Sequence, residues 1–146
     1  MTAPARGDFV PRELRLAARP SELQRAREYV DDAAAAFGFN RSDRFQLVFA
    51  VNEAVTNAIR HGSPDDAGTI GLRVSAVGDR LTLTVRDCGR FVTPVNAGRM
   101  ADHGRGMEMM ATLVDDFEVS SEPGGTTVRL GKRRQVARVP VEDDRV

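Results

Sequence analysis

The chain has little of what several classes of protein require. It contains one cysteine, Cys88, and two histidines, which excludes an internal disulfide and a cysteine-rich metal site and leaves few ligands for zinc. No uninterrupted apolar run approaches the length that spans a membrane. The N-terminus, MTAPARGDFVPRE, lacks the apolar segment of a secretory signal. These absences favour a cytoplasmic protein.

An excess of charge of one sign is also missing. The 21 basic residues balance the 21 acidic ones, so the formal net charge is zero. A strongly charged chain would attract nucleic acid or an anionic membrane through its overall field. We therefore expect neither direct nucleic-acid binding nor membrane binding.

The length and the apolar pattern predict one α+β domain. A chain of 146 residues, 41% of them hydrophobic, is large enough to bury a core. Helical patterns come first and mostly antiparallel strand patterns follow, which predicts a two-layer sandwich. Its mixed, mostly antiparallel sheet should be covered on one face by helices. We assign residues 1–11 to a loose leader, 12–131 to the domain and 132–146 to a charged tail.

Turn and capping signals divide the domain into segments. Ser21-Glu22-Leu23-Gln24 has the form of a capping box that opens a helix, and Gly38 should close that helix. Alternating apolar residues predict two hairpins, the first turning at Gly78-Asp79. The expected segments are a strand at 12–18, helices at about 21–38, 42–61 and 106–114, and hairpins at 70–85 and 117–131.

The helix predicted at 42–61 has an apolar side and a polar side. At about 100° per residue, one wide arc should pack on the sheet. This arc holds Val48, Val51, Val55, Ala58 and Ile59, and the opposite side holds Gln46, Glu53, Asn57 and Arg60.

Two residues on the polar side suggest chemistry. Asn57 is unfavourable in the middle of a helix because its amide competes for backbone hydrogen bonds, and its oxygen is a suitable ligand for Mg²⁺. Glu53, one turn earlier, should face the same volume, where a carboxylate can accept a proton from an attacking hydroxyl. A solvated helix face would also explain the two residues when they are taken alone.

Three further motifs follow in the chain. Asp87, two residues before Gly89, is placed to accept a hydrogen bond from the amino group of adenine, or forms an ordinary turn. Gly104-Arg105-Gly106 precedes a helix whose first N–H groups can hold phosphate, or acts as a hinge. The hydroxyls of Thr126 and Thr127 matter only if Asp87 contacts adenine. Each motif is weak alone, but their order and spacing predict one site for Mg-ATP.

Together, the motifs resemble those of the histidine-kinase-like ATPase superfamily, which has the Bergerat ATP-binding fold. Within it, the chain is most similar to the bacterial anti-sigma-factor serine kinases. The resemblance covers about residues 12–131. In chain order, the matching stretches are FAVNEAVTNAIRHG, VRDCGRF, GRGMEMMATLVDD and GGTTVRL.

The resemblance implies ATP and Mg²⁺ as cofactors and a role for each motif. Asn57 would hold Mg²⁺ between the phosphates, and Glu53 would be the base or the orienting carboxylate. Asp87 would select adenine, with Gly89 beside it and Thr126 and Thr127 supporting it directly or through water. At the phosphates, Gly104 and Gly106 would give support and Arg105 would contact phosphate or a partner, with 91–103 as the lid.

The implied function is that of an ATP-dependent protein-serine kinase that is also an anti-sigma factor. Such a protein sequesters a sigma factor as a homodimer and phosphorylates a serine on a small antagonist protein. The alternative is a non-catalytic module that binds sigma factor or antagonist, with ATP as a structural ligand or absent. Glu53 favours the kinase. Arg90-Phe91, where the family often has a second glycine, favours the alternative.

Overall fold

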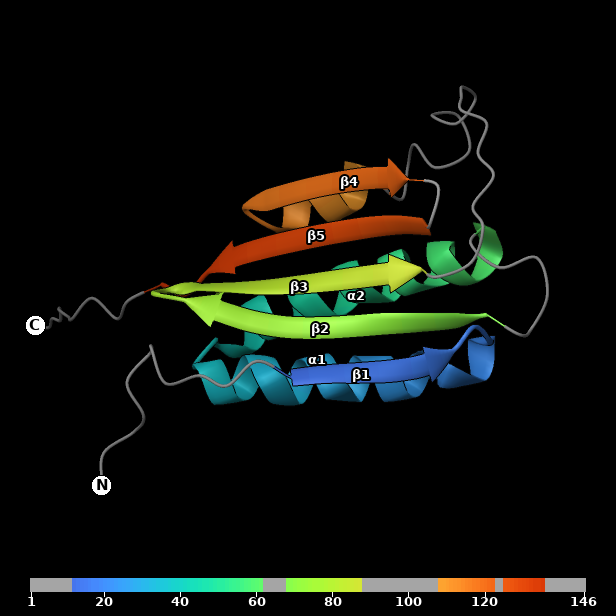
Figure 1. The fold of residues 1–146 in the computed structure, drawn as a ribbon. Helices are drawn as coiled ribbons and strands as arrows, with labels where there is room; N and C mark the ends of the chain where they lie inside the picture. The colour runs from blue at the N-terminus through green and yellow to red at the C-terminus, as the bar shows by residue number, and fades with distance from the viewer. Residues whose placement is uncertain (1–11, 62–67, 88–107, 123–124, 136–146) are drawn as a thin grey trace, which may run out of the picture.

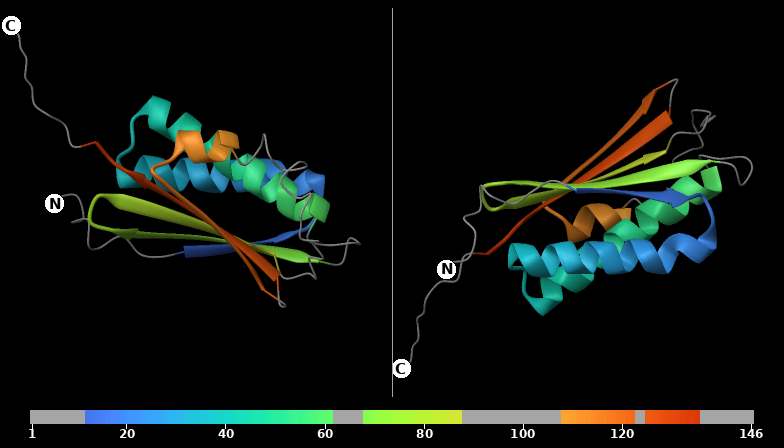
Figure 2. Two further views of the ribbon diagram at one scale, coloured as in Figure 1. Left: turned by 90° about the horizontal axis from the view of Figure 1, so that it is seen from above. Right: turned by 60° about the horizontal axis from the view of Figure 1, so that its bottom comes forward.

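The chain forms a layer of helices packed on one face of a β-sheet, as Figure 1 and Figure 2 show. The computed structural model describes residues 12–61, 68–87, 108–122 and 125–135. One turn of 3₁₀ helix precedes α1, and residues 108–113 are also helical. The elements are β1 (Arg12–Ala17), α1 (Leu23–Phe37), α2 (Arg41–His61), β2 (Thr69–Val77), β3 (Arg80–Asp87), β4 (Asp116–Glu122) and β5 (Gly125–Arg133).

The sheet has the strand order β1-β2-β3-β5-β4, and every pairing between these strands is antiparallel. The pairs β2–β3 and β4–β5 are hairpins, and β5 lies between β3 and β4 because it pairs with both. Both helices lie on the same side of the sheet (Figure 2). The predicted two-layer α+β sandwich is therefore confirmed.

The core lies between the two layers. Val51 and Val55 of α2 are fully buried, as predicted, and Val48, Ala58 and Ile59 are partly buried against the core. The buried arc also includes three residues that the prediction left out, namely Leu47, Ala50 and Ala54. Two of the three are alanines, whose small side chains let a helix approach a sheet closely.

The inner face of β3 is apolar, which explains why the helices pack against the sheet. Leu81, Leu83 and Val85 occupy alternate positions and are at most 1% exposed. Alternate residues of a strand point to the same face, so all three side chains face the helices. Burying each such side chain stabilises the fold by about 1.5–3 kcal/mol.

The start of α1 differs from the prediction. Ser21 lies inside the 3₁₀ turn, so Glu22 precedes α1, and no side-chain hydrogen bond caps the helix. The predicted capping box is therefore wrong. A side-chain cap occurs at α2 instead, where Asn40 Oδ1 accepts a hydrogen bond from the backbone N of Asp43 at 2.8 Å.

Arg134, directly after β5, joins the end of α1 to the β2–β3 turn. Its Nη1 donates to the carbonyl oxygen of Phe37 at 2.6 Å, and its guanidinium lies 4.8 Å from the Phe37 ring centroid. Its Nη2 lies 3.6 Å from Asp79 Oδ1. Gly38 closes α1 as predicted, with φ 102°, and a Cβ there would lie 3.0 Å from Arg134 Nη1. Arg134 therefore packs against both layers.

We expect Arg134→Ala to lower the free energy of unfolding by about 1.5–3 kcal/mol, because it leaves the Phe37 carbonyl without its charged donor. Arg133→Ala is the matched control. Arg133 is exposed, and its hydrogen bond to Asp115 Oδ2, at 2.7 Å, comes from its backbone N, which the substitution keeps. That substitution should change stability by less than about 0.5 kcal/mol. Urea unfolding measures both, and equal losses would contradict the role of Arg134.

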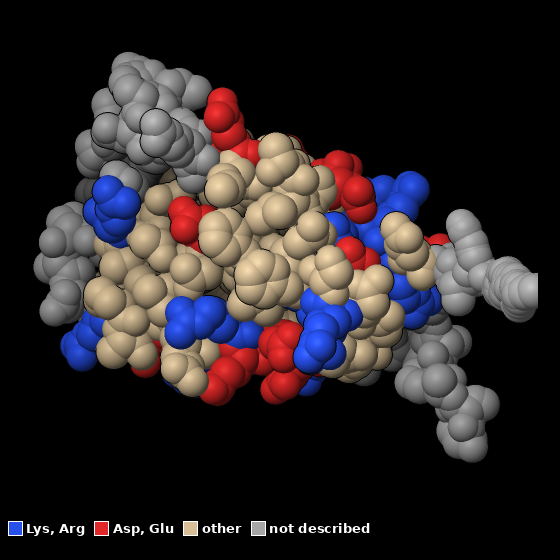
Figure 3. All heavy atoms as spheres, turned by 180° about the vertical axis from the view of Figure 1, so that it is seen from behind, with Lys and Arg blue, Asp and Glu red and all other residues tan. Residues whose placement is uncertain are grey.

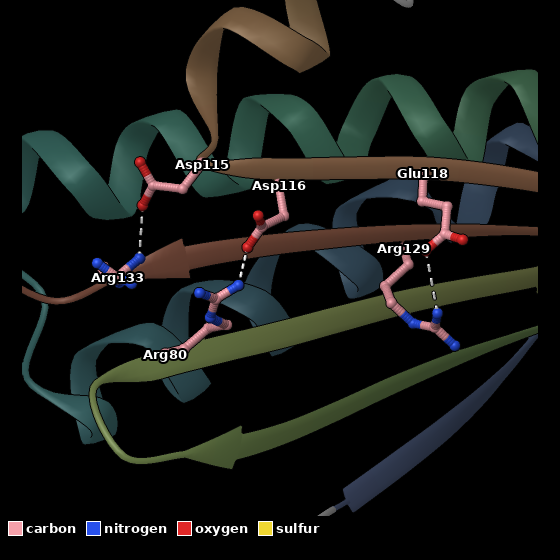
Figure 4. A network of polar contacts seen from close by, with 6 residues as sticks. All are labelled: Arg80, Asp115, Asp116, Glu118, Arg129 and Arg133. Carbon is pink, nitrogen blue, oxygen red and sulfur yellow. Dashed lines mark hydrogen bonds and ion pairs between the residues drawn. The ribbon is translucent and has the colours of Figure 1, made fainter.

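The edge strand β4 is also joined to the sheet by ion pairs on the face away from the helices (Figure 4). Asp116 pairs with Arg80 of β3 across β5, and Glu118 pairs with Arg129 of β5 at 3.3 Å. A Cβ at Gly131 would lie 2.9 Å from Asp116 Oδ2, so glycine leaves room for the first pair. Exposed pairs of this kind contribute at most about 1 kcal/mol each, so they help to align β4 more than they stabilise the fold.

The helical face carries charges of both signs. Figure 3 shows basic and acidic side chains interspersed around a middle region of uncharged residues on this face. Neither sign dominates the face. This agrees with the zero net charge of the chain. Within the described ranges, no helix is both long and apolar enough to cross a membrane.

Candidate ATP site

The predicted site residues come from the C-terminal part of α2 and the end of β3. α2 packs against β3, and both elements end on the same side of the molecule (Figures 1 and 2). Glu53 and Asn57 are both half-buried on α2 and lie one helical turn apart, which places them on one face. Asp87 is the last residue of β3. The fold therefore gathers residues from the first and second motifs toward one end of the sandwich.

Asn57 carries a buried polar atom that has no hydrogen-bond partner among the described residues. Its Nδ2 is inaccessible to solvent and has no hydrogen-bond partner within the described part of the chain. A buried donor without a partner costs about 1–3 kcal/mol, so it calls for an explanation such as a missing ligand. An amide offers both a donor for phosphate oxygens and an oxygen for a hard cation. Asn57 therefore fits Mg-ATP.

One other buried side-chain atom lacks a partner in the described ranges, the hydroxyl of Tyr29. Tyr29 belongs to α1, and the Arg12 guanidinium of β1 lies 6.0 Å from its ring centroid. Burial raises the pKa of the Tyr29 hydroxyl, which keeps this group neutral. Tyr29 is partly buried against the core, and we assign it a packing role.

Asp87 is a buried carboxylate at the end of the inner face of the sheet. It is 3% exposed and continues the alternation of buried residues along β3. The antiparallel register places Thr126 of β5 directly opposite it. Opposed residues in a ladder share a face, so the Thr126 hydroxyl lies on the same side of the sheet as the carboxylate. Thr126 Oγ1 also lies 3.5 Å from Ser121 Oγ of β4.

Thr127 lies on the other face of the sheet. It is opposite Arg86, whose Nη1 donates to Thr127 Oγ1 at 3.2 Å. The structure thus separates the two threonines that the sequence analysis grouped together. Thr126 shares the face of Asp87, while a role for Thr127 beside adenine stays a prediction.

Four predicted residues, Gly89, Gly104, Arg105 and Gly106, lie outside the described residues, as does the proposed lid at 91–103. The helix expected after the third motif is described at 108–113, where Met110 is fully buried. Sequence analysis also missed Lys132. Asp87 and Lys132 are the buried charged residues of the described ranges. The alternation 128, 130, 132 along β5 was the signal that placed Lys132 inward.

A family model described as the histidine kinase-like ATPase domain matches residues 16–132. The chain belongs to this family. The match contains the strands and helices that carry Glu53, Asn57, Asp87 and Thr126. The predicted family is therefore confirmed, and an ATPase domain implies that the chain binds ATP.

Relatives narrow the class of this ATPase domain. The chain is 28% identical over 136 residues to the serine-protein kinase RsbW of Bacillus pumilus. This match covers 82% of this chain and 83% of the relative. The chain is 31% identical over 130 residues to an anti-sigma F factor of Caldanaerobacter subterraneus, over 82% and 91% of the two chains.

A solved structure supports the same assignment. The crystal structure of the RsbU and RsbW domains of a Mycobacterium tuberculosis protein matches with a TM-score of 0.70 and 26% identity. The match covers 90% of this chain and 35% of that longer chain. Together with the fold and the family, these relatives indicate that the ATPase domain is a protein kinase, as predicted.

Proposed function

We propose that this chain is an ATP-dependent protein-serine kinase that also acts as an anti-sigma factor. It would bind a sigma factor and phosphorylate a serine of a small antagonist protein. The observation that supports the kinase most is the placement of Glu53 and Asn57 one turn apart on α2, where the Asn57 amide carries a buried donor without a partner among the described residues. The names of the relatives support the choice of partners.

Four of the predicted site residues that the structure describes have a role in this proposal. When bound, Mg-ATP supplies the γ-phosphoryl group. Asn57 would hold the Mg²⁺ and contact the phosphates, and so help to position the γ-phosphoryl group for transfer. Glu53 accepts the proton of the acceptor serine hydroxyl or orients that hydroxyl. Asp87 accepts a hydrogen bond from the adenine amino group, and Thr126 supports the base on the same face of the sheet.

The wider assembly is part of the same proposal. We retain a homodimer and residues 1–11 as the leader. The ATPase domain, predicted as 12–131, would extend through the end of β5 and Arg134, and the predicted tail, 132–146, would begin after them. A sigma factor as partner would place the protein in the cytoplasm.

Incubation with radiolabelled ATP, Mg²⁺ and candidate antagonists from the same genome tests the kinase. We expect label on one serine of one antagonist, and none after alanine replaces that serine. An antagonist that binds tightly but gains no label would favour the non-catalytic module instead. Labelling that persists after the serine is replaced would contradict a serine acceptor.

The nucleotide itself gives a separate prediction. We expect GTP to bind about 5–150-fold more weakly than ATP, equivalent to about 1–3 kcal/mol. Guanine carries a carbonyl oxygen where adenine has its amino group, so it cannot donate a hydrogen bond to Asp87. Calorimetry with Mg-ATP and Mg-GTP measures the difference. Equal affinities would remove the adenine role of Asp87 and leave the phosphate contacts untouched.

A further inference from the structure

Lys132 is a buried cation on the inner face of β5. Val128 and Leu130 occupy the two preceding inward positions and are buried, whereas the third inward position holds a lysine that is 9% exposed. A buried ammonium is costly unless it is paired and hydrogen-bonded. The groups that pair with the Lys132 ammonium therefore explain how a charge is accommodated at this buried position.

The Lys132 ammonium contacts two helices. Its Nζ donates to the carbonyl oxygen of Leu113 at 3.0 Å and lies 3.9 Å from Asp43 Oδ1. Leu113 ends the helical segment 108–113, where carbonyl groups lack partners within the helix. Asp43 lies in the first turn of α2. One side chain of the sheet thus joins the C-terminal end of one helix to the N-terminal end of another.

We propose that Lys132 is a positioning residue of the ATP site, which it serves by fixing segment 108–113 relative to α2. α2 carries Glu53 and Asn57, and segment 108–113 follows the third motif in sequence. Asp43 precedes Glu53 by ten residues, or about 15 Å along the helix, so Lys132 acts through α2 and touches no reacting group. This inference rests on the proposed function.

At position 132, a charged side chain makes contacts with both helices that an apolar side chain cannot make. An apolar side chain would fill the same space but would leave the Leu113 carbonyl and Asp43 without a donor. The side chains of Lys132 and Asp43 are 11% and 17% exposed, so salt screens their attraction weakly. A hydrogen bond to segment 108–113 and an ion pair to α2 together constrain the relative position of the two helices more than packing alone does.

Lys132→Met tests the inference, because methionine keeps the length of the side chain and removes its charge. We expect the Kd for Mg-ATP to rise about tenfold, while the Kd for adenosine, which lacks phosphates, changes less than twofold. Lys132→Arg should restore most of the affinity. In the nucleotide-free protein, amide hydrogen exchange should become faster in segment 108–113 and stay unchanged in β2 and β3.

Arg129→Met is the matched control, since it removes a cation from the outer face of the same strand, where Arg129 pairs with Glu118. It should leave both the nucleotide affinities and the exchange rates unchanged. Equal losses of ATP and adenosine affinity in Lys132→Met, or unchanged exchange in segment 108–113, would overturn the inference.

Asp43→Asn provides a second variant if Lys132→Met fails to fold. It removes the ion pair and keeps the hydrogen bond from Lys132 to Leu113. We expect a smaller rise in the Kd for Mg-ATP, again without a change for adenosine, and an unchanged Kd would contradict positioning by this pair. Absence of Mg-ATP binding by the unaltered protein would instead overturn the proposed function, whereas the exchange comparison tests Lys132 by itself.

Discussion

Glu53→Gln should slow phosphoryl transfer to the acceptor serine by about 10²–10⁴-fold and leave the Kd for Mg-ATP nearly unchanged. Glutamine keeps the size of the side chain and one acceptor oxygen, but its amide cannot take a proton from the acceptor hydroxyl. Glu53 is half-buried on α2, so the substitution should also leave the fold intact. Single-turnover transfer of labelled phosphate, with the Kd from calorimetry, separates the two effects.

Glu28→Gln is the matched control for this experiment. Glu28 is an exposed residue of α1 that accepts a hydrogen bond from Gln24, and it belongs to none of the motifs. This variant should transfer phosphate at the unaltered rate. If Glu53→Gln does the same, Glu53 is not the catalytic carboxylate and the chain's activity must be assigned to another group.

The second large effect is expected at Asn57, where stability and binding should change in opposite directions. Asn57→Ala should raise the free energy of unfolding of the nucleotide-free protein by about 1 kcal/mol. It removes a buried donor without a partner and places a better helix former in α2. The same substitution should raise the Kd for Mg-ATP by about 10–150-fold, through loss of contacts to charged groups. Urea unfolding and calorimetry measure the two quantities.

Asn52→Ala on the same helix controls for the loss of an asparagine. Asn52 Oδ1 already accepts a hydrogen bond from Arg27 Nη1 of α1 at 3.0 Å, so its amide is used within the fold. We expect this variant to lose a little stability and to keep its affinity for Mg-ATP. A loss of stability in Asn57→Ala as large as that in Asn52→Ala would show that Asn57 supports the fold rather than a ligand.

Local patterns predicted most of the fold. The turn at Gly78-Asp79 joins β2 to β3 as expected, and Gly78 has a positive φ of 61°. Gly38 ends α1, and the apolar arc of α2 faces the sheet. These features depend on residues close in sequence, so periodicity and turn chemistry were sufficient to predict them. The capping box at Ser21 failed because Pro20 begins a 3₁₀ turn that takes up Ser21.

Contacts between distant segments could not be predicted in the same way. The pairing of Asp87 with Thr126 depends on the register between β3 and β5, which no local pattern specifies. Thr127 lies on the opposite face of the sheet from Asp87, because adjacent residues of a strand face opposite ways. Lys132 was assigned to a charged tail because lysine is mostly exposed in proteins, and only its partners on two helices explain its burial.

The strand order also determines at which stage of folding the proposed ATP site can form. Asp87 and Thr126 belong to different hairpins, β2–β3 and β4–β5, which meet only through the pairing of β3 with β5. Contacts within a hairpin are local and form readily, whereas pairing between strands far apart in sequence is slower. A chain emerging from the ribosome therefore has Glu53, Asn57 and Asp87 long before it has the strand that carries Thr126 and Lys132. On the proposed assignment, the ATP site is complete only after β5, the last strand of the described part of the chain, has been made.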